Sequence, residues 1–340
     1  MRPVFEVLAP GIFTTVQDRG RYGYRAYGIP VAGAMDQYAF RVANLLVGNS
    51  QDAAALEITL PGLQLKVLAQ TVVAITGANL GGVLNGKELP CWQAVSVKAG
   101  DEIRFTKLHS GCRSYLAVAG GIDVPLVLGS RSTYVRGRLG GLNGRRIQAG
   151  DCLFAPEPTQ KNWARVDRQV PLAYIPSYER SITLRVLMGP QADYFASAGQ
   201  ETFLTGEYVV SQDTDRMGAR LIGTKIEHAD KADIVSDGVP HGAIQVPGNG
   251  QPIIMLADSQ TVGGYPKIAT VVSADWYKLG QVIPGDKISF TTISYQAAIE
   301  LLQAQEQQLT DLSYYLDKAQ VRIFQVNLQG KGYTVMVEEL

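Results

Sequence analysis

The sequence predicts a mainly β protein built from two tandem β-barrel domains with a few short helices. Thirty-six glycines and 16 prolines separate many short apolar runs, such as ALEITL at 55–60, TVVAITG at 71–77 and RSYLAVAGG at 113–121. Short apolar runs between turn residues are typical of β-sandwiches and β-barrels. Few stretches keep the apolar spacing of a helix, so strands dominate the prediction.

A sequence repeat indicates that the two domains are similar. VKAGDEIRF at 97–105 returns as VIPGDKISF at 282–290, an offset of 185 residues. The Gly-Gly pair that begins at Gly81 returns at Gly263, an offset of 182 residues. Either match alone would be weak, but two nearly equal offsets favour a duplicated domain.

The domain boundary is expected in the polar, proline-containing stretch 155–179. This gives an N-terminal domain over 1–175 and a C-terminal domain over 176–340. Apolar residues at helical spacing predict a long helix over 296–318 in the second domain. The last 20 residues, VRIFQVNLQGKGYTVMVEEL, predict a terminal hairpin.

The first domain contains one clear helix signal. Phe40 and Ala43 lie on one face of a predicted helix over 37–47. Asp36 is a good N-cap because its carboxylate can accept a hydrogen bond from a free backbone N–H of the first turn. Gly48 then ends the helix.

Composition excludes several classes of protein. The 340 residues are 46% hydrophobic, and Lys plus Arg equals Asp plus Glu at 31 each, so no excess charge attracts nucleic acid. No segment approaches the ~18 consecutive apolar residues of a membrane span, and the first residues lack the apolar part of a signal peptide. We therefore expect a cytoplasmic protein with no nucleic-acid or membrane partner. Cys91, Cys112 and Cys152 have no zinc-site spacing and are expected to be buried thiols.

Two familiar kinds of site are not predicted. GGVLNGKE at 81–88 has the glycine and lysine spacing of a phosphate-binding loop, but Glu88 stands where Ser or Thr should follow, and Asn85-Gly86 is a strong hairpin turn. The segment is therefore predicted to be a hairpin. The three histidines have no metal-ligand spacing, and no nucleophile-elbow motif occurs, so a metal site or a self-contained hydrolase is not expected.

Two clusters of polar residues are candidates for function. TTVQDRGRYGYRAYGIPVAGAMD at 14–36 combines carboxylates, arginines and aromatic residues among glycines. Its alternative interpretation is a long loop over a barrel mouth, in which Asp18 and the arginines only satisfy one another and Asp36 only caps its helix. Both interpretations stay open on residue chemistry alone.

The second cluster lies at strand ends and glycine-rich turns of the second domain. Its polar residues are Asp213, Asp215, Arg216, Asp237, Gln245, Asp258 and Gln260. An arginine can hold a carboxylate at two points, and carboxamides can orient an amide group. Turn formation or surface solvation explains several of these residues equally well. It explains Asp258-Ser259-Gln260-Thr261 least well, because four polar residues follow an apolar strand and precede two glycines.

Both clusters carry a family resemblance. The 14–36 motif, together with SDGVPHGAIQVPGNGQPIIMLADSQTVGGYPKIATV at 236–271, resembles the allophanate hydrolase subunit 2 family, also called the KipI antagonist or biotin-dependent carboxyltransferase family. The resemblance covers nearly the whole chain. It implies that the two barrels are cyclophilin-like, and it implies a KipI-like partner protein of related fold.

The resemblance also implies the residues of the site. Those in the first motif would be Gln17, Asp18, Arg21, Met35 and Asp36, and those in the second Asp237, Gln245, Asp258, Gln260, Thr261 and Tyr265, with Arg216 added from the preceding loop. Asp237 and Asp258 would orient or deprotonate, Arg216 would hold a carboxylate or phosphate, and Gln245 and Gln260 would fix an amide. Where many relatives read LADRQTTGGYP, this chain has Ser259 and Val262, which changes the detailed contacts.

The function implied is that of one subunit in an ATP-dependent 5-oxoprolinase complex. With a KipI-like protein and a LamB/YcsF-like protein, such a complex opens 5-oxoproline to glutamate, and ATP is used by the complex without assignment to any one of its proteins. The isolated chain is expected to be inactive. One alternative is a carboxyltransferase acting on a urea-like substrate with carboxybiotin from a partner, because this chain carries no Met-Lys-Met biotin-attachment sequence. The other is a non-catalytic antagonist that binds a KipI-like kinase inhibitor.

Overall fold

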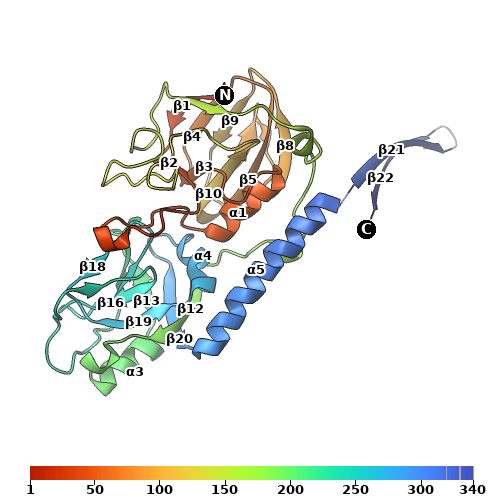
Figure 1. Ribbon diagram of the computed structural model, residues 1–340. Coiled ribbons are helices and arrows are strands. Elements are labelled where there is room, and N and C mark those ends of the chain that lie inside the picture. Colours follow the sequence, from red (N-terminus) through yellow and green to blue (C-terminus); the bar gives the residue numbers. More distant parts are fainter. Residues whose placement is uncertain (319, 329–330, 340) are drawn as a thin grey trace.

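The computed structural model describes residues 1–318, 320–328 and 331–339, and it confirms a mainly β fold with few helices. Two lobes lie one above the other, the first formed by strands β1 to β11 and the second by β12 to β20 (Figure 1). A long helix and a hairpin follow at the C-terminal end, and the hairpin extends away from both lobes (Figure 1).

The first lobe consists of two sheets that enclose one apolar core. The six-stranded sheet has the order β11 (Cys152–Ala155), β1 (Arg2–Pro10), β4 (Leu63–Val67), β9 (Glu102–Phe105), β6 (Gly82–Leu84) and β7 (Lys87–Glu88). The five-stranded sheet has the order β2 (Phe13–Gln17), β3 (Ala55–Thr59), β10 (Ser110–Val118), β5 (Thr71–Asn79) and β8 (Gln93–Val97). All pairings are antiparallel, so each strand turns alternate side chains into the shared core.

The second lobe is a closed seven-stranded barrel. Its strands follow the order β12 (Ser181–Met188), β19 (Lys267–Val271), β16 (Ala243–Gln245), β17 (Ile253–Met255), β14 (Gly218–Ile222), β13 (Tyr208–Val210) and β20 (Lys287–Thr292). A small ladder of β15 (Asp237–Gly238) and β18 (Val262–Gly263) lies outside the barrel. The pair of β12 and β20 is parallel and closes the barrel.

Helices cover the sheets and join the lobes. They are α1 (Gln37–Leu46), α2 (Gln160–Trp163), α3 (Ser197–Thr205), α4 (Trp276–Leu279) and α5 (Tyr295–Lys318), with single 3-10 turns at η1 (Arg25–Tyr27), η2 (Leu172–Tyr174), η3 (Ala192–Tyr194) and η4 (Ser273–Asp275). The predicted helices over 37–47 and 296–318 are confirmed as α1 and α5, and Asp36 caps α1 by accepting from Ala39 N at 2.9 Å. No helix among the described residues is long and apolar enough to cross a membrane.

The C-terminal helix returns to the first lobe. Its buried residues Leu309, Leu312 and Leu316 belong to the same apolar cluster as α1, and Glu306 forms a two-point ion pair with Arg41. The long helix thus follows β20 of the second lobe in sequence but packs against the first lobe. The predicted hairpin after it is confirmed as β21 (Gln320–Leu328) and β22 (Lys331–Glu339).

The sequence repeat corresponds to a shared turn. Gly100 and Gly285 both have positive φ, +92° and +91°, and the following aspartate of each closes the turn by accepting a backbone N–H at 2.8 Å. The second match is not reproduced in backbone conformation, because Gly81 has φ +62° whereas Gly263 lies in β18. The segment 81–88 is a hairpin, as predicted.

Candidate functional site

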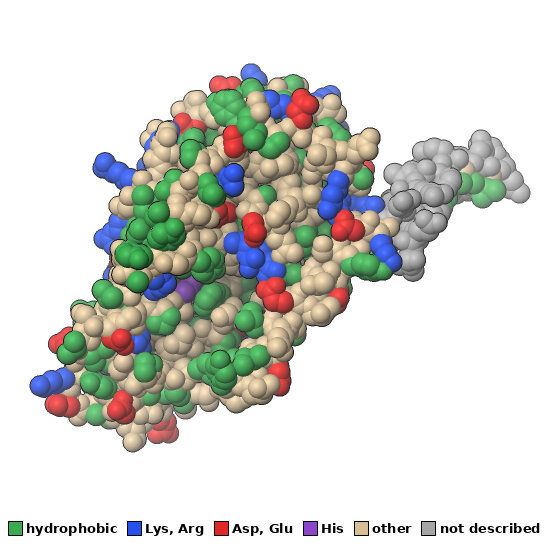
Figure 2. Space-filling model, in the orientation of Figure 1, with side chains coloured by type: hydrophobic (Ala, Val, Ile, Leu, Met, Phe, Trp, Pro, Cys, Tyr) green, Lys and Arg blue, Asp and Glu red, His purple; other side chains and the backbone are tan. Residues whose placement is uncertain are grey.

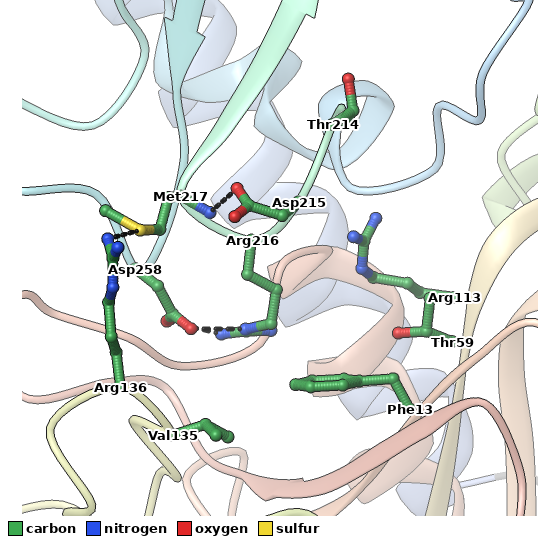
Figure 3. Close-up of a pocket in the computed structure, with 10 residues that line it drawn as sticks. All are labelled: Phe13, Thr59, Arg113, Val135, Arg136, Thr214, Asp215, Arg216, Met217 and Asp258. Carbon is green, nitrogen blue, oxygen red and sulfur yellow. Dashed lines mark hydrogen bonds and ion pairs between the residues drawn. The ribbon is translucent and has the colours of Figure 1, made fainter. Parts of the chain in front are cut away.

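A cleft of about 440 Å³ opens between the two lobes (Figure 3). Its lining residues from the first lobe are Phe13, Thr59, Arg113, Val135 and Arg136, and those from the second are Thr214, Asp215, Arg216, Met217 and Asp258. The cleft therefore combines guanidinium groups, carboxylates and apolar side chains. On the face of the molecule in view, charges of both signs are interspersed without one large patch (Figure 2).

The first-lobe wall is the outer face of the five-stranded sheet. Phe13, Thr59 and Arg113 are direct cross-strand neighbours on β2, β3 and β10, so their side chains share one face. Glu57 on β3 and Tyr115 on β10 are paired two positions further along these strands, and they form a deeper row on the same face. Because side chains alternate along a strand, the intervening residues turn into the lobe's apolar core.

The second-lobe wall is centred on a buried pair, Arg216 and Asp258. Arg216 Nε donates to Asp258 Oδ2 at 2.9 Å, and Arg216 Nη2 donates to Asp258 Oδ1 at 3.0 Å. The backbone N–H of Asp258 also donates to the Arg216 carbonyl at 3.0 Å. Asp258 follows β17 and Arg216 precedes β14, two paired strands, which explains why residues 42 positions apart meet.

Glu57 is a functional candidate that the sequence analysis missed. It is buried on β3, where one carboxylate oxygen accepts from Arg216 Nη1 and the other accepts from Met35 N and Tyr115 Oη, both at 2.8 Å. Burial by itself would lower the pKa of Arg216, but the carboxylates of Asp258 and Glu57 outweigh it and raise that pKa. The signal in the sequence was a lone carboxylate in the apolar run ALEITL.

A second buried network joins the lobes beside the cleft. Asp36 Oδ2 accepts from Gln281 Nε2 at 2.8 Å and from Tyr178 Oη at 2.9 Å. Gln281 Oε1 in turn accepts from the backbone N–H groups of Cys112 and Arg113, both at 2.9 Å. Burial raises the pKa of Asp36 to about 6, although its hydrogen bonds oppose the shift. Asp36 therefore caps its helix and also ties the second lobe to the first.

The other residues predicted in the first motif anchor a loop. Asp18 accepts hydrogen bonds from Gly20 N at 2.8 Å and from Ser130 Oγ at 2.7 Å, and Gln17 Nε2 donates to Thr133 O at 3.1 Å. Arg21 is fully buried and donates to the Val127 and Ser132 carbonyls at 3.0 and 2.9 Å. These contacts match the loop interpretation that the sequence left open. None of the three residues lines the cleft.

The remaining residues of the second motif lie around the β15–β18 ladder. Asp237 is exposed and forms an ion pair with buried Lys267 at 2.8 Å, and the hydrogen bond from Lys267 holds the pKa of Asp237 below its usual value. Gln245 Nε2 donates to the Tyr265 carbonyl at 3.0 Å. Thr261 is buried and Gln260 is exposed. Of the second cluster, Asp215, Arg216 and Asp258 line the cleft. Asp237, Gln245, Gln260 and Thr261 do not line it.

Metal-ligand groups do not gather in the part of the chain that is described. No cluster of three or more His, Cys, Asp or Glu side chains with metal-binding geometry occurs there. His241 stacks on Trp276 with ring centroids 4.1 Å apart. Burial, followed by the charges of Arg25 and Arg216, lowers the pKa of His241 to about 3, so its imidazole is neutral at pH 7.

Comparison with known proteins places this architecture in a family. The model of the carboxyltransferase domain, subdomain A and B, matches residues 27–292, which contain every cleft residue except Phe13. The chain belongs to this family, and the resemblance read from the sequence is confirmed. It is 38% identical over 313 residues to a protein of Escherichia coli K12 that is named as a 5-oxoprolinase subunit, covering 92% of this chain and 99% of that protein.

Other members of the carboxyltransferase family are much longer. The urea amidolyase of Lachancea kluyveri is 39% identical over 323 residues, which cover 89% of this chain but 18% of that protein. The crystal structure of Kluyveromyces lactis urea amidolyase superposes with a TM-score of 0.86 at 36% identity, covering 92% of this chain and 20% of that chain. This chain thus spans about a fifth of the urea amidolyases it matches.

Proposed function

We propose that this chain is one subunit of an ATP-dependent 5-oxoprolinase complex, which opens 5-oxoproline to glutamate together with a KipI-like protein and a LamB/YcsF-like protein. One observation carries the proposal: a small cleft holds a fixed buried carboxylate, Asp258, beside apolar side chains and guanidinium groups with unused N–H donors. A compact acidic lactam matches that combination. The match along 99% of a bacterial 5-oxoprolinase subunit supports it.

Coupling to ATP answers the main energetic difficulty of this reaction. An unstrained five-membered lactam is stable to hydrolysis, and ATP, when bound to the complex, would supply a phosphoryl group to the lactam oxygen and make the ring carbon electrophilic. Water would then add to that carbon, the C–N bond would break and the nitrogen would take a proton, which leaves an acyl phosphate; a second water would hydrolyse this to glutamate and phosphate. No residue of this chain is assigned to ATP.

In this proposal Asp258 has the central role in this chain. Its carboxylate lines the cleft and can accept a hydrogen bond from the lactam N–H or from the attacking water. Arg216 positions that carboxylate through two hydrogen bonds and is itself held by Glu57. In this proposal Arg216 is a positioning residue and not the holder of a substrate carboxylate or phosphate that the resemblance implied.

Reconstitution tests the proposal. Purified chain is mixed with its KipI-like and LamB/YcsF-like partners, each protein is omitted in turn, and ATP-dependent formation of glutamate from 5-oxoproline is measured. We expect turnover only with all three proteins. Asp258→Asn should lower turnover by about 100-fold or more with assembly intact, since a general base or orienting group contributes roughly 10²–10⁴-fold.

The controls separate the possible outcomes. Glu102→Gln removes a partly exposed carboxylate on β9 that does not line the cleft, and it should leave turnover unchanged. If Asp237→Asn abolishes turnover while Asp258→Asn does not, the catalytic group lies at the β15–β18 ladder and the cleft assignment is wrong. Full activity of the two partners without this chain would refute its membership of the complex.

A second candidate is carboxyl transfer to a urea-like substrate, favoured by the TM-score of 0.86 with a urea amidolyase. In that case carboxybiotin would be delivered by another chain, and the cleft would hold the acceptor. Co-purification with a biotinylated protein, together with urea-dependent loss of the carboxyl group from its carboxybiotin, would favour this candidate over hydrolysis of 5-oxoproline.

A further inference from the structure

The hydrogen-bond donors of Arg216 are almost fully used by the protein. Nε donates to Asp258, Nη2 donates to Asp258 and to the Gly33 carbonyl at 2.7 Å, and Nη1 donates to Glu57. A guanidinium group has five N–H donors, so Arg216 has one left. It cannot hold a substrate carboxylate at two points without giving up a buried partner.

Arg113 is the opposite case. It is 6% exposed and lines the same cleft, yet its side chain makes only one hydrogen bond to the described residues, from Nη1 to the Gly280 carbonyl at 2.7 Å. Its Nε is buried without a hydrogen-bond partner among the described residues and lies 3.9 Å from Glu57 Oε1, too far for a hydrogen bond. Four of its five N–H donors are therefore unused within the described protein. Buried donors in native proteins have partners, so this guanidinium indicates a ligand.

The neighbour of Arg113 on the sheet has the same property. Thr59 is its direct cross-strand partner, lines the cleft, and has a buried hydroxyl without a hydrogen-bond partner among the described residues. Side chains so placed are about 4.5–5.5 Å apart at Cβ, which suits two donors that share one oxyanion. Arg136, which is exposed, lines the same cleft and adds a second cationic donor group (Figure 3).

We propose that Arg113 and Thr59 form a carboxylate subsite in the cleft, with Arg136 at its rim, for a small acid that carries a compact apolar ring. Phe13, Val135 and Met217 supply the apolar surface for the ring. This inference rests on the proposed function in naming the acid: the carboxylate of 5-oxoproline lies against Arg113, and its lactam group lies toward Asp258.

The charges of the cleft explain why the subsite selects by geometry. The buried cations Arg113 and Arg216 are balanced by the buried carboxylates Glu57 and Asp258. An anion is therefore held by directional donors rather than by net positive charge, and charge-assisted two-point bonds to guanidinium are the strong, specific kind. A ligand of the same ring without a carboxylate loses these bonds.

The test compares two ligands that differ in the carboxylate alone. Binding of L-5-oxoproline and of 2-pyrrolidinone is measured by calorimetry or ligand-observed NMR, on the full chain and on the reconstituted complex. We expect wild-type protein to prefer 5-oxoproline by about tenfold or more, as one charge-assisted pair predicts. Arg113→Gln should remove this preference and leave 2-pyrrolidinone binding unchanged. Arg104→Gln, an exposed arginine on β9, is the matched control and should keep the preference.

A second variant keeps the test decisive if Arg113→Gln does not fold. Thr59→Val keeps the shape of the side chain and removes the unpartnered hydroxyl, so it should lower 5-oxoproline affinity severalfold with no loss of stability. A preference for 5-oxoproline that survives in every variant that folds overturns the subsite, as does binding of 5-oxoproline and 2-pyrrolidinone to wild-type protein with equal affinity.

Failure of the proposed function gives a different result. If glutarate or another small carboxylic acid binds in an Arg113-dependent manner while 5-oxoproline does not bind, the subsite stands and the oxoprolinase assignment falls. If no small carboxylic acid binds to the chain or to the complex, the subsite is refuted.

Discussion

Replacing Glu57 by Gln should destabilise the protein far more than the change of one atom suggests. Three donors point at this carboxylate: Arg216 Nη1, Met35 N and Tyr115 Oη. A carboxamide has one acceptor oxygen, so its NH₂ group must face a donor N–H. Loss of the charge-assisted bond costs about 1.5–3 kcal/mol and the unsatisfied donor about 1–3 kcal/mol, which together give about 2.5–6 kcal/mol.

Urea unfolding followed by tryptophan fluorescence measures this loss. Trp92 belongs to the first lobe and Trp276 to the second, so both lobes report. Because Glu57 lies in one lobe and Arg216 in the other, the whole fluorescence transition should shift to lower urea. Glu102→Gln, at a partly exposed position of β9, should change the free energy of unfolding by less than about 0.5 kcal/mol. A Glu57→Gln variant within about 1 kcal/mol of wild type would refute the argument that this carboxylate fastens the lobes.

Three further predictions concern the packing between the lobes. The pKa of Asp36 is raised from 3.8 to about 6, so protonation of this carboxyl group stabilises the folded state. This contribution to the free energy of unfolding is fully present below about pH 4 and is lost as pH rises through about 6, by about 3 kcal/mol in total. Asp36→Asn should remove that component from the pH dependence of unfolding. Gly280→Ala should destabilise the protein by about 1–3 kcal/mol, since the added Cβ meets the backbone of Met35 and Asp36 at 2.8 Å, whereas Gly238→Ala, with nothing within 4 Å, should be nearly neutral. Leu312→Ala should cost about 2–5 kcal/mol and Leu302→Ala, 39% exposed, less than about 1 kcal/mol, both measured by denaturant unfolding.

Local signals in the sequence were sufficient for the local structure. The N-cap at Asp36, the hairpin turn at Asn85-Gly86 and the repeated Gly-Asp turns each follow from contacts within a few residues. The pairing of Asp258 with Arg216 was also within reach, because polar residues at the ends of neighbouring strands meet. Periodicity likewise predicted α5, although not the lobe against which it packs.

The site itself depends on pairings that no local pattern encodes. Glu57 meets Arg216 across 159 positions of sequence, and Arg113 lies beside Thr59 only through the register of β3 and β10. A carboxylate in an apolar strand indicates a buried charge, but its partner is fixed by how two lobes dock. The family motifs therefore include Asp258 of the cleft, but none of the residues on the sheet face opposite it.

The way the lobes are joined also constrains how the cleft can work. From Asp258 the buried hydrogen bonds run through Arg216, Glu57 and Tyr115 to the backbone of Asp36, whose side chain bonds Gln281 of the second lobe. Rotation of one lobe against the other would leave several buried polar groups without partners at once, each at a cost of about 1–3 kcal/mol. Entry of a substrate by hinge motion is therefore disfavoured. We expect access to change instead through exposed rim side chains such as Arg136, which can move without breaking a buried hydrogen bond.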